Sequence, residues 1–95
     1  MRKYEVMYII RTDVDEELVK STVEKFKNVI LNGGGEITKH DLSGKRRLAY
    51  EIEKHRDGYY VLVQFSSESV VVTELDRLLK ISDEVIRFLI TKQAV

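Results

Sequence analysis

Residues Lys3–Arg11 read KYEVMYIIR, a stretch of aromatic, β-branched and other apolar residues that is apolar on both alternating faces in its second half. A strand that is buried on one face alternates apolar and polar residues, whereas a strand buried on both faces does not. We therefore predict that Lys3–Arg11 is a central strand of a sheet. The rest of the chain must supply its neighbouring strands and the layer that covers them.

A helix is predicted after this strand. Asp13, with Glu16 three residues later, is an N-cap signature. Apolar residues and one threonine then recur at helical spacing, at Leu18, Thr22, Phe26, Val29 and Ile30. We expect the helix to run from about Val14 to Leu31 and to stop at Asn32–Gly35, because glycine accepts the left-handed conformation that closes a helix.

A β-hairpin is predicted next. The segment from Glu36 to Glu53 has the pattern of one long strand with a break at Ser43-Gly44, where we expect a bulge. Arg56-Asp57-Gly58 has the residue types of a turn. Tyr59–Phe65 then reads YYVLVQF, which is dense in aromatic and β-branched residues and is typical of a strand.

A second helix and a last strand complete the pattern. Ser66, Ser67 and Ser69 are competing N-caps for the helix, which should end near Ile81. Its apolar face would carry Val71, Val72, Leu75, Leu78 and Leu79. Val85–Thr91 alternates as a strand. The order βαββαβ predicts an α+β, ferredoxin-like fold, in which two helices cover one face of a four-stranded antiparallel sheet, as one domain over residues 1–95.

One face of this sheet would have no covering layer. The residues expected to face the helices are Val6, Tyr8, Val61, Val63, Phe88 and Ile90. Those expected on the opposite face are Met7, Ile9, Tyr60, Leu62 and Leu89. An uncovered apolar face suggests a partner, but scattered apolar residues on an open sheet are also normal. Both interpretations stay open at this point.

The composition narrows the function classes. The chain of 95 residues is 43% hydrophobic and 34% charged, which is typical of a folded, soluble protein without a membrane span. It contains no cysteine, which excludes disulfides, thiolate catalysis and cysteine zinc sites and suits a reducing cytoplasm. Sixteen basic and sixteen acidic residues cancel, so that any attraction to nucleic acid must come from local clusters.

No pattern of catalytic or metal-binding residues is present. The run Gly33–Gly35 follows a helix, whereas phosphate-binding loops precede one, and therefore it reads as a helix end. His40 and His55 are the only histidines and have no supporting ligands at metal-site spacing. We expect no catalytic residue, no metal, no cofactor and no small-molecule substrate.

The fold order also occurs in RNA-recognition domains, whose third strand stacks bases on aromatic residues. The sequence DGYYVLVQF, residues 57–65, has Asp57, Tyr60 and Val61 where that signature needs a basic, a small and an aromatic residue. A base-stacking platform of this type is therefore not predicted.

Residues Gly44–Ile52 read GKRRLAYEI, in which three consecutive cations lead into an apolar alternation. Charges on an edge strand protect it from pairing with another sheet. Clustered arginines also hold phosphate oxygens, and Tyr50 adds a ring and a hydroxyl close by. The two roles can coexist.

This stretch resembles the signature of the sixth protein of the bacterial small ribosomal subunit, a family with the pattern Gly, any, basic, polar, Leu, small, Tyr, any, Ile. The matching residues are Gly44, Arg46, Arg47, Leu48, Ala49, Tyr50 and Ile52. The family also begins like MRKYEVMYIIR, has a third strand like GYYVLV and ends like SDEVIRFLITK, so that the resemblance covers nearly the whole chain. Glu51 stands where proline is frequent, and the longer acidic tail of some members does not follow Val95.

The resemblance implies a cytoplasmic, non-enzymatic ribosomal protein that supports subunit assembly and translation. It would bind the central domain of small-subunit ribosomal RNA together with the eighteenth small-subunit protein, whose basic charge would make up for the neutrality of this chain. The candidate phosphate contacts are Arg2, Lys3, Lys45, Arg46, Arg47, Arg87 and Lys92. The candidate partner contacts are Leu48, Tyr50, Ile52 and Tyr60.

The competing hypothesis is a homo-oligomeric ferredoxin-like domain that binds a metabolite or a protein partner with its open sheet face. The two hypotheses differ in the expected state of the isolated protein. The metabolite domain would be a defined oligomer with a pocket, whereas the ribosomal protein would be a monomer.

Overall fold

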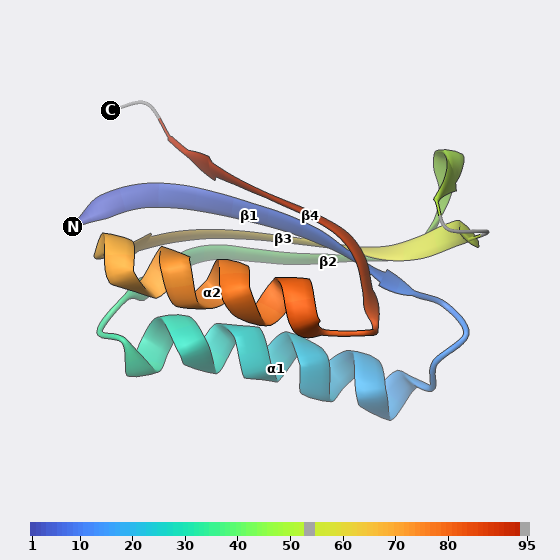
Figure 1. Ribbon diagram of the computed structural model, residues 1–95, viewed down its shortest axis with the longest axis horizontal. Helices are drawn as coiled ribbons and strands as arrows, with labels where there is room; N and C mark the ends of the chain where they lie inside the picture. The colour runs from blue at the N-terminus through green and yellow to red at the C-terminus, as the bar shows by residue number, and fades with distance from the viewer. Residues whose placement is uncertain (53–54, 94–95) are drawn as a thin grey trace.

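The computed structural model describes residues 1–52 and 55–93, and for residues 43, 45–46, 49–52 and 55 it describes the backbone only. The elements are β1 (Arg2–Arg11), α1 (Glu16–Asn32), β2 (Glu36–Ile52), β3 (His55–Ser67), α2 (Ser69–Ile81) and β4 (Val85–Lys92). The strands form a four-stranded antiparallel sheet in the order β2-β3-β1-β4. Both helices lie on the same face of the sheet (Figure 1), which confirms the ferredoxin-like fold.

The core lies between this sheet face and the helices, and β1 crosses its centre. β1 pairs along its whole length with β3 and along most of its length with β4. The buried core residues include Val6, Tyr8 and Ile10 of β1, Val61, Val63 and Phe65 of β3, Phe26 and Ile30 of α1, and Leu75 and Leu79 of α2. The ring of Tyr8 meets Phe26 edge to face, with 5.1 Å between ring centroids. The prediction of a central strand and of its helix-facing residues is confirmed.

The N-cap of α1 differs from the prediction. Asp15 is the capping residue, and its carboxylate accepts a hydrogen bond of 2.8 Å from the Leu18 N–H. Asp13 instead forms an ion pair of 2.6 Å with Arg11 at the end of β1. Asp15 caps because it directly precedes Glu16, the first helical residue, and so reaches the free N–H groups of the first turn. At the other end, Gly34 takes the predicted left-handed conformation, with a φ of 84°.

The serines predicted to cap α2 do not do so. The N-cap is Glu68, whose side chain makes no capping hydrogen bond. Ser66 and Ser67 belong to β3, where they pair with Lys3 and Arg2. The strand therefore runs further than its apolar stretch, because pairing with β1 continues to the first residues of the chain.

The predicted turn at Arg56–Gly58 is also wrong. These residues belong to β3, where Asp57 pairs with Arg47, and Gly58 pairs with Arg46 on one side and Arg11 on the other. Residues 53–54, between β2 and β3, lie outside the described part of the chain. The bulge predicted near Gly44 is confirmed, because the pairing shifts between Leu42 and Lys45 and Gly44 has a φ of 34°. Neither described helix is long and apolar enough to cross a membrane.

The first prediction concerns the Tyr8 hydroxyl, which is buried without a hydrogen-bond partner in the described part of the chain. Burial raises the pKa of Tyr8, so that the hydroxyl keeps its proton at neutral pH. Leaving such a group unpaired costs about 1–3 kcal/mol. Tyr8→Phe keeps the ring and should leave the free energy of unfolding in urea unchanged or raise it by about 1 kcal/mol.

The matched control is Tyr4→Phe, because Tyr4 lies on the same strand and stacks on Phe65 with 5.7 Å between ring centroids. A loss of stability in Tyr8→Phe beyond that of the control would contradict the prediction and would indicate a bound water on the hydroxyl.

The second prediction concerns His40 of β2, whose Nε2 atom is buried with no partner among the described residues. Desolvation and then the charge of Lys27 lower the pKa of His40 below 6.5, against the opposing charges of Glu24 and Asp41. The folded state therefore binds this proton less tightly than the unfolded chain does. The stability that neutral His40 contributes is complete above the unfolded pKa of 6.5 and is lost as the pH falls through the folded pKa.

Urea unfolding between about pH 7.5 and 5 should therefore show a fall in stability that His40→Gln reduces. His55→Gln is the control, since it shows how much of the fall belongs to the other histidine. An unchanged pH dependence in His40→Gln would contradict the assignment.

Candidate RNA and partner interface

The predicted basic stretch lies on an edge of the sheet. Lys45–Arg47 belong to β2, the first strand in the sheet order. Beyond the bulge at Gly44, β2 and the start of β3 extend past the helices, and the end of β2 rises on the uncovered side of the sheet (Figure 1). A bulge redirects the strand that carries it. The side chain of Arg47 is exposed here, whereas those of Lys45 and Arg46 lie outside the described set.

Arg87 lies toward the same end of the sheet, but on the opposite edge strand, β4. It is exposed on β4 and is paired across the sheet with Ile9 of β1. Arg11 follows Ile9 by two residues on β1, but its guanidinium forms an ion pair with Asp13. The hydrogen bond and the charge of Asp13 raise the pKa of Arg11. We call Arg47 and Arg87 the hairpin group.

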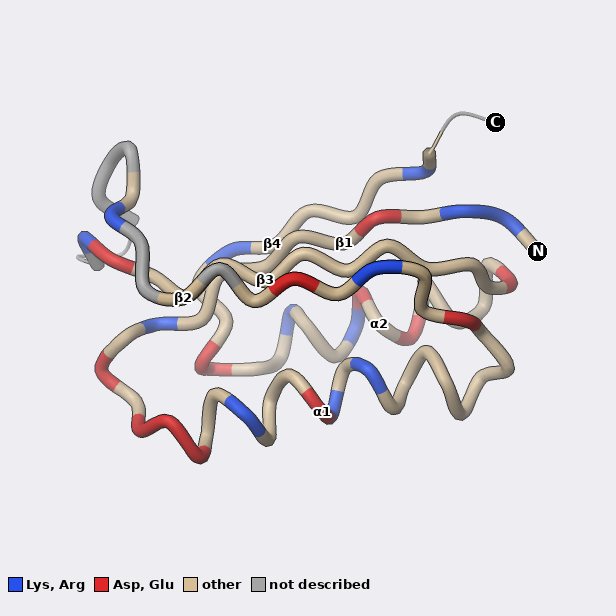
Figure 2. Tube along the Cα trace, turned by 180° about the vertical axis from the view of Figure 1, so that it is seen from behind, with Lys and Arg blue, Asp and Glu red and all other residues tan. Residues whose placement is uncertain are grey.

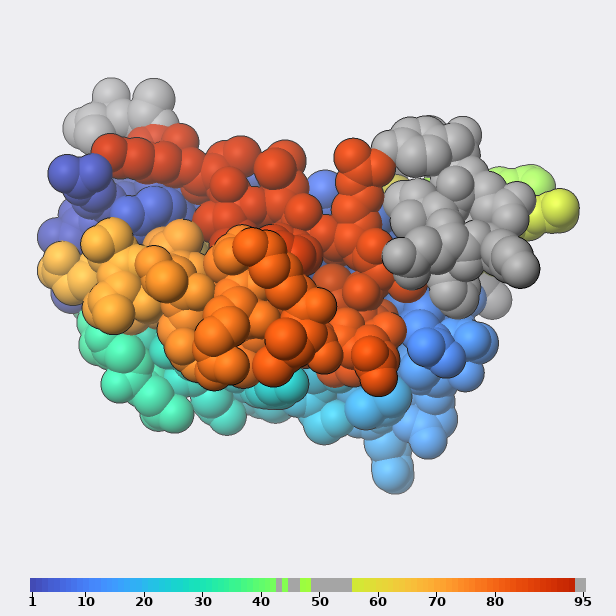
Figure 3. Space-filling view, in the orientation of Figure 1, coloured from blue at the N-terminus to red at the C-terminus, as the bar shows by residue number. Residues whose placement is uncertain are grey.

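The remaining predicted phosphate contacts lie at the opposite end of β1. Lys92 is paired close to the start of the strand, opposite Tyr4, and the Gln93 N–H donates a hydrogen bond of 2.9 Å to the Lys3 carbonyl. Arg2, Lys3 and Lys92 are all exposed, and we call them the terminal group. Figure 2 shows basic residues at both ends of the sheet, and Figure 3 shows the start of β1 beside the end of β4. At roughly 3.4 Å per residue, Lys3 and Ile9 are about 20 Å apart along β1.

The predicted partner residues have unequal exposure. Tyr60 is half-buried on the uncovered face, where it pairs with Ile9. Leu48 is only 8% exposed, so that its own chain covers most of it. The side chains of Tyr50 and Ile52 lie outside the described set. Among the predicted partner residues with described side chains, Tyr60 is therefore the one that a partner could contact on the uncovered face.

The uncovered sheet face has an apolar row across its middle. Leu89, Met7 and Leu62 are paired in register across β4, β1 and β3. Leu89 is 57% exposed and the other two are half-buried, as expected for a face without a covering layer. Polar residues border this row, with a hydrogen bond of 3.0 Å from Gln64 Nε2 to Glu5 Oε2 on one side.

The sequence prediction misses two residues at the hairpin end. Arg56 is exposed and adds a further cation on β3, whereas its residue type suggests a turn. Gly58 is paired with Arg46 of β2 and is also a strand residue, not a turn residue. A glycine within a strand pattern often indicates close packing and could have revealed the second of them.

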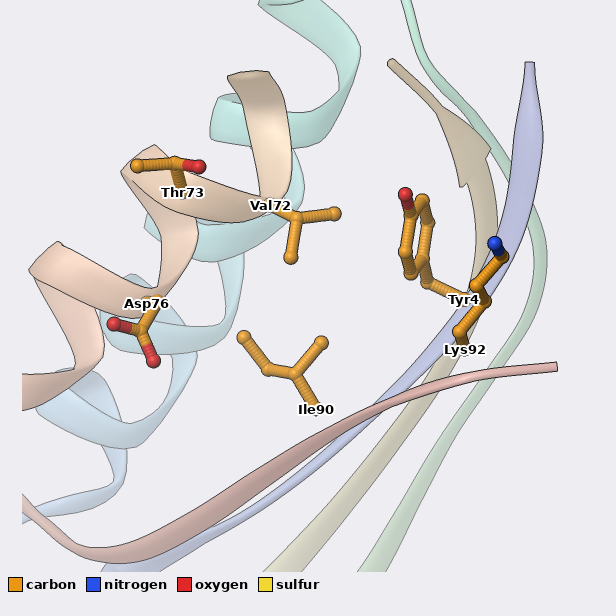
Figure 4. Close-up of a pocket in the computed structure, with 6 residues that line it drawn as sticks. All are labelled: Tyr4, Val72, Thr73, Asp76, Ile90 and Lys92. Carbon is orange, nitrogen blue, oxygen red and sulfur yellow. The ribbon is translucent and has the colours of Figure 1, made fainter. Parts of the chain in front are cut away.

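A cavity of about 400 Å³ lies beside the terminal group, between α2 and β4. Figure 4 shows Val72 and Ile90 between Thr73 and Asp76 on one side and Tyr4 and Lys92 on the other. Asp76 forms an ion pair of 2.9 Å with Lys80, which offsets the charge of its carboxylate. The Thr73 hydroxyl in this lining donates a hydrogen bond of 3.3 Å to the Ser69 carbonyl. No group of three or more possible metal ligands occurs among the residues that the structure describes.

Comparisons with known proteins give a consistent result. The family model of ribosomal protein S6 matches residues 3–92. The small ribosomal subunit protein bS6 of Moorella thermoacetica is 52% identical over 92 residues, which are 97% of this chain and 94% of the relative. That of Clostridium acetobutylicum is 54% identical over 90 residues, 95% of each chain. The crystal structure of 30S ribosomal protein S6 from Thermotoga maritima superposes with a TM-score of 0.92 at 33% identity, over 97% of this chain and 87% of that one.

Proposed function

The chain belongs to the ribosomal protein S6 family, and on that premise we propose that it binds the central domain of small-subunit ribosomal RNA together with the eighteenth small-subunit protein. Membership makes it a structural protein of the bacterial small ribosomal subunit, located on the ribosome in the cytoplasm. The observation that carries the finer proposal is the exposure of Arg47 on an edge strand next to an uncovered sheet face.

The proposed RNA contacts are the hairpin group and the terminal group, with Lys45 and Arg46 added from the sequence pattern. Exposed arginine and lysine side chains bind phosphate oxygens and release counterions from the RNA. One phosphate cannot reach both groups, because Lys3 and Ile9 are about 20 Å apart along β1. The two groups would therefore contact separate backbone segments of a folded RNA.

The proposed partner contact is centred on Tyr60 and the apolar row of Leu89, Met7 and Leu62. A tyrosine beside exposed aliphatic side chains is typical of the buried centre of a protein interface. The net charge of zero fits this arrangement, because a basic partner can supply the cations that this chain lacks. Tyr50 and Ile52 remain proposed contacts from the sequence, whereas the burial of Leu48 within its own chain leaves it little surface for a partner. We also propose that residues 1–95 act as one domain, since the helices and strands share a core.

The third prediction concerns salt. If about three to five of the proposed cations contact phosphates at the same time, the affinity of the wild-type protein for the RNA–partner complex should fall by roughly tenfold to a hundredfold or more between about 50 and 200 mM salt. Arg47→Gln with Arg87→Gln should make the slope of log affinity against log salt shallower by about two. Filter binding at several salt concentrations measures both quantities.

Arg77→Gln is the matched control, because Arg77 is exposed on α2 and already paired with Glu74. It should leave the slope unchanged. Salt-independent binding of the wild-type protein would refute the phosphate contacts.

The fourth prediction concerns the division of work between the two proteins. The isolated chain should be monomeric and bind central-domain RNA at least tenfold more weakly than in the presence of its partner, since a few cations on a neutral domain release few counterions. Gel-shift titrations with the chain alone, the partner alone and both together measure the difference. Equally tight binding by the chain alone would contradict the proposal.

A further inference from the structure

Two side chains at the hairpin end are far more buried than their positions suggest. Ile9 lies on the uncovered face and is 3% exposed, whereas Leu89 on the same face is 57% exposed. Leu48 lies on the edge strand beyond the helices and is 8% exposed, whereas Leu42 on the same strand is 43% exposed. Neither Ile9 nor Leu48 belongs to the core cluster between the sheet and the helices.

Gly58 explains how these two side chains come together. A Cβ atom on Gly58 would overlap Ile9 Cγ2 and would lie 3.5 Å from Leu48 Cδ2. Both side chains therefore occupy the space above the α-carbon of Gly58. Unlike Gly34 and Gly44, Gly58 does not have a positive φ, so any residue could adopt its backbone conformation. What the position requires is the absence of a side chain.

The backbone alone constrains this part of β2 weakly. The pairing with β3 shifts between Leu42 and Lys45 and again between Arg47 and Ile52. Only the short segment Lys45–Arg47 pairs regularly between these two shifts. β2 is an edge strand, and none of the described strands pairs with its outer side. Leu48 directly follows this segment, so that fixing Leu48 also fixes the direction of Arg47.

We propose that Leu48, Ile9 and Gly58 form a positioning contact, here called the distal contact, which holds the end of β2 over the uncovered sheet face and fixes the backbone of Lys45–Arg47, whose cations are the proposed phosphate contacts. The inference rests on the proposed function of these cations. Its physical basis is preorganisation: a cationic segment that is already in its bound direction loses less conformational freedom on binding.

The experiment compares Leu48→Ala with Leu42→Ala, which makes the same chemical change at an exposed position on the same strand. Affinity for a central-domain RNA fragment with the partner protein is measured over a series of salt concentrations. Leu48→Ala should bind on the order of tenfold more weakly, with a salt slope shallower by about one to two. Leu42→Ala should have the affinity and the salt slope of the wild type. Leu48→Met should also have the wild-type affinity and slope, because methionine has nearly the same volume as leucine.

Gly58→Ala tests the same contact from the opposite strand. Its Cβ would displace Ile9, whose β-branched side chain has few alternative rotamers. The expected result is the phenotype of Leu48→Ala. If Gly58→Ala does not fold, the affinity and salt slope of Leu48→Ala alone test the distal contact.

The salt slope distinguishes positioning from a general loss of stability, because a smaller folded fraction weakens binding equally at every salt concentration. An unchanged slope in Leu48→Ala would overturn the inference, even with weaker binding. If the wild-type protein does not bind the RNA complex, the proposed function fails, and amide hydrogen exchange tests the distal contact separately. Exchange in Lys45–Arg47 should then accelerate in Leu48→Ala while β1 and both helices stay protected. Equal exchange in the two proteins would refute the contact.

Discussion

The packing of β1 against both helices is the interaction on which the rest of the structure depends. Tyr8 and its helix-facing neighbours are buried against Phe26 and the other core residues, and β1 is paired on both of its edges. Since side chains alternate along a strand, burying this set turns Met7 and Ile9 to the opposite face. The core thus fixes which residues the chain offers to other molecules, and a shift of register by one residue would exchange the two faces.

Most of the fold could be predicted because its signals are periodic. The alternation in Lys3–Arg11 and Tyr59–Phe65 and the helical spacing around Phe26 each report burial, which dominates folding. The errors fall where a local signal competes with tertiary structure. The Asp13 carboxylate could cap a helix, but it forms an ion pair with Arg11 instead. Gly58 has the right chemistry for a turn, but it serves the packing of Ile9 within a strand.

The candidate site was less predictable than the fold. The edge position of Lys45–Arg47 and the uncovered face followed from the order of the elements. The separation of the basic residues into two groups did not, because Lys92 and Arg87 are close in sequence but pair with opposite halves of β1. The burial of Leu48 within its own chain could not be predicted either. An apolar residue in an alternating strand gives the same sequence pattern whether a partner protein or the same chain covers its side chain.

The pairing of β1 has a consequence for synthesis of the chain. Its two neighbours, β3 and β4, are both much later in the sequence, and Tyr4 meets Lys92 close to the end of the described residues. The sheet can therefore be completed only after β4 has left the ribosome that makes the chain. Until then, α1 and the β2–β3 hairpin can form local contacts, while one edge of β1 stays unpaired. A nascent chain of this protein must therefore release β4 before the folded sheet can join a new ribosomal subunit.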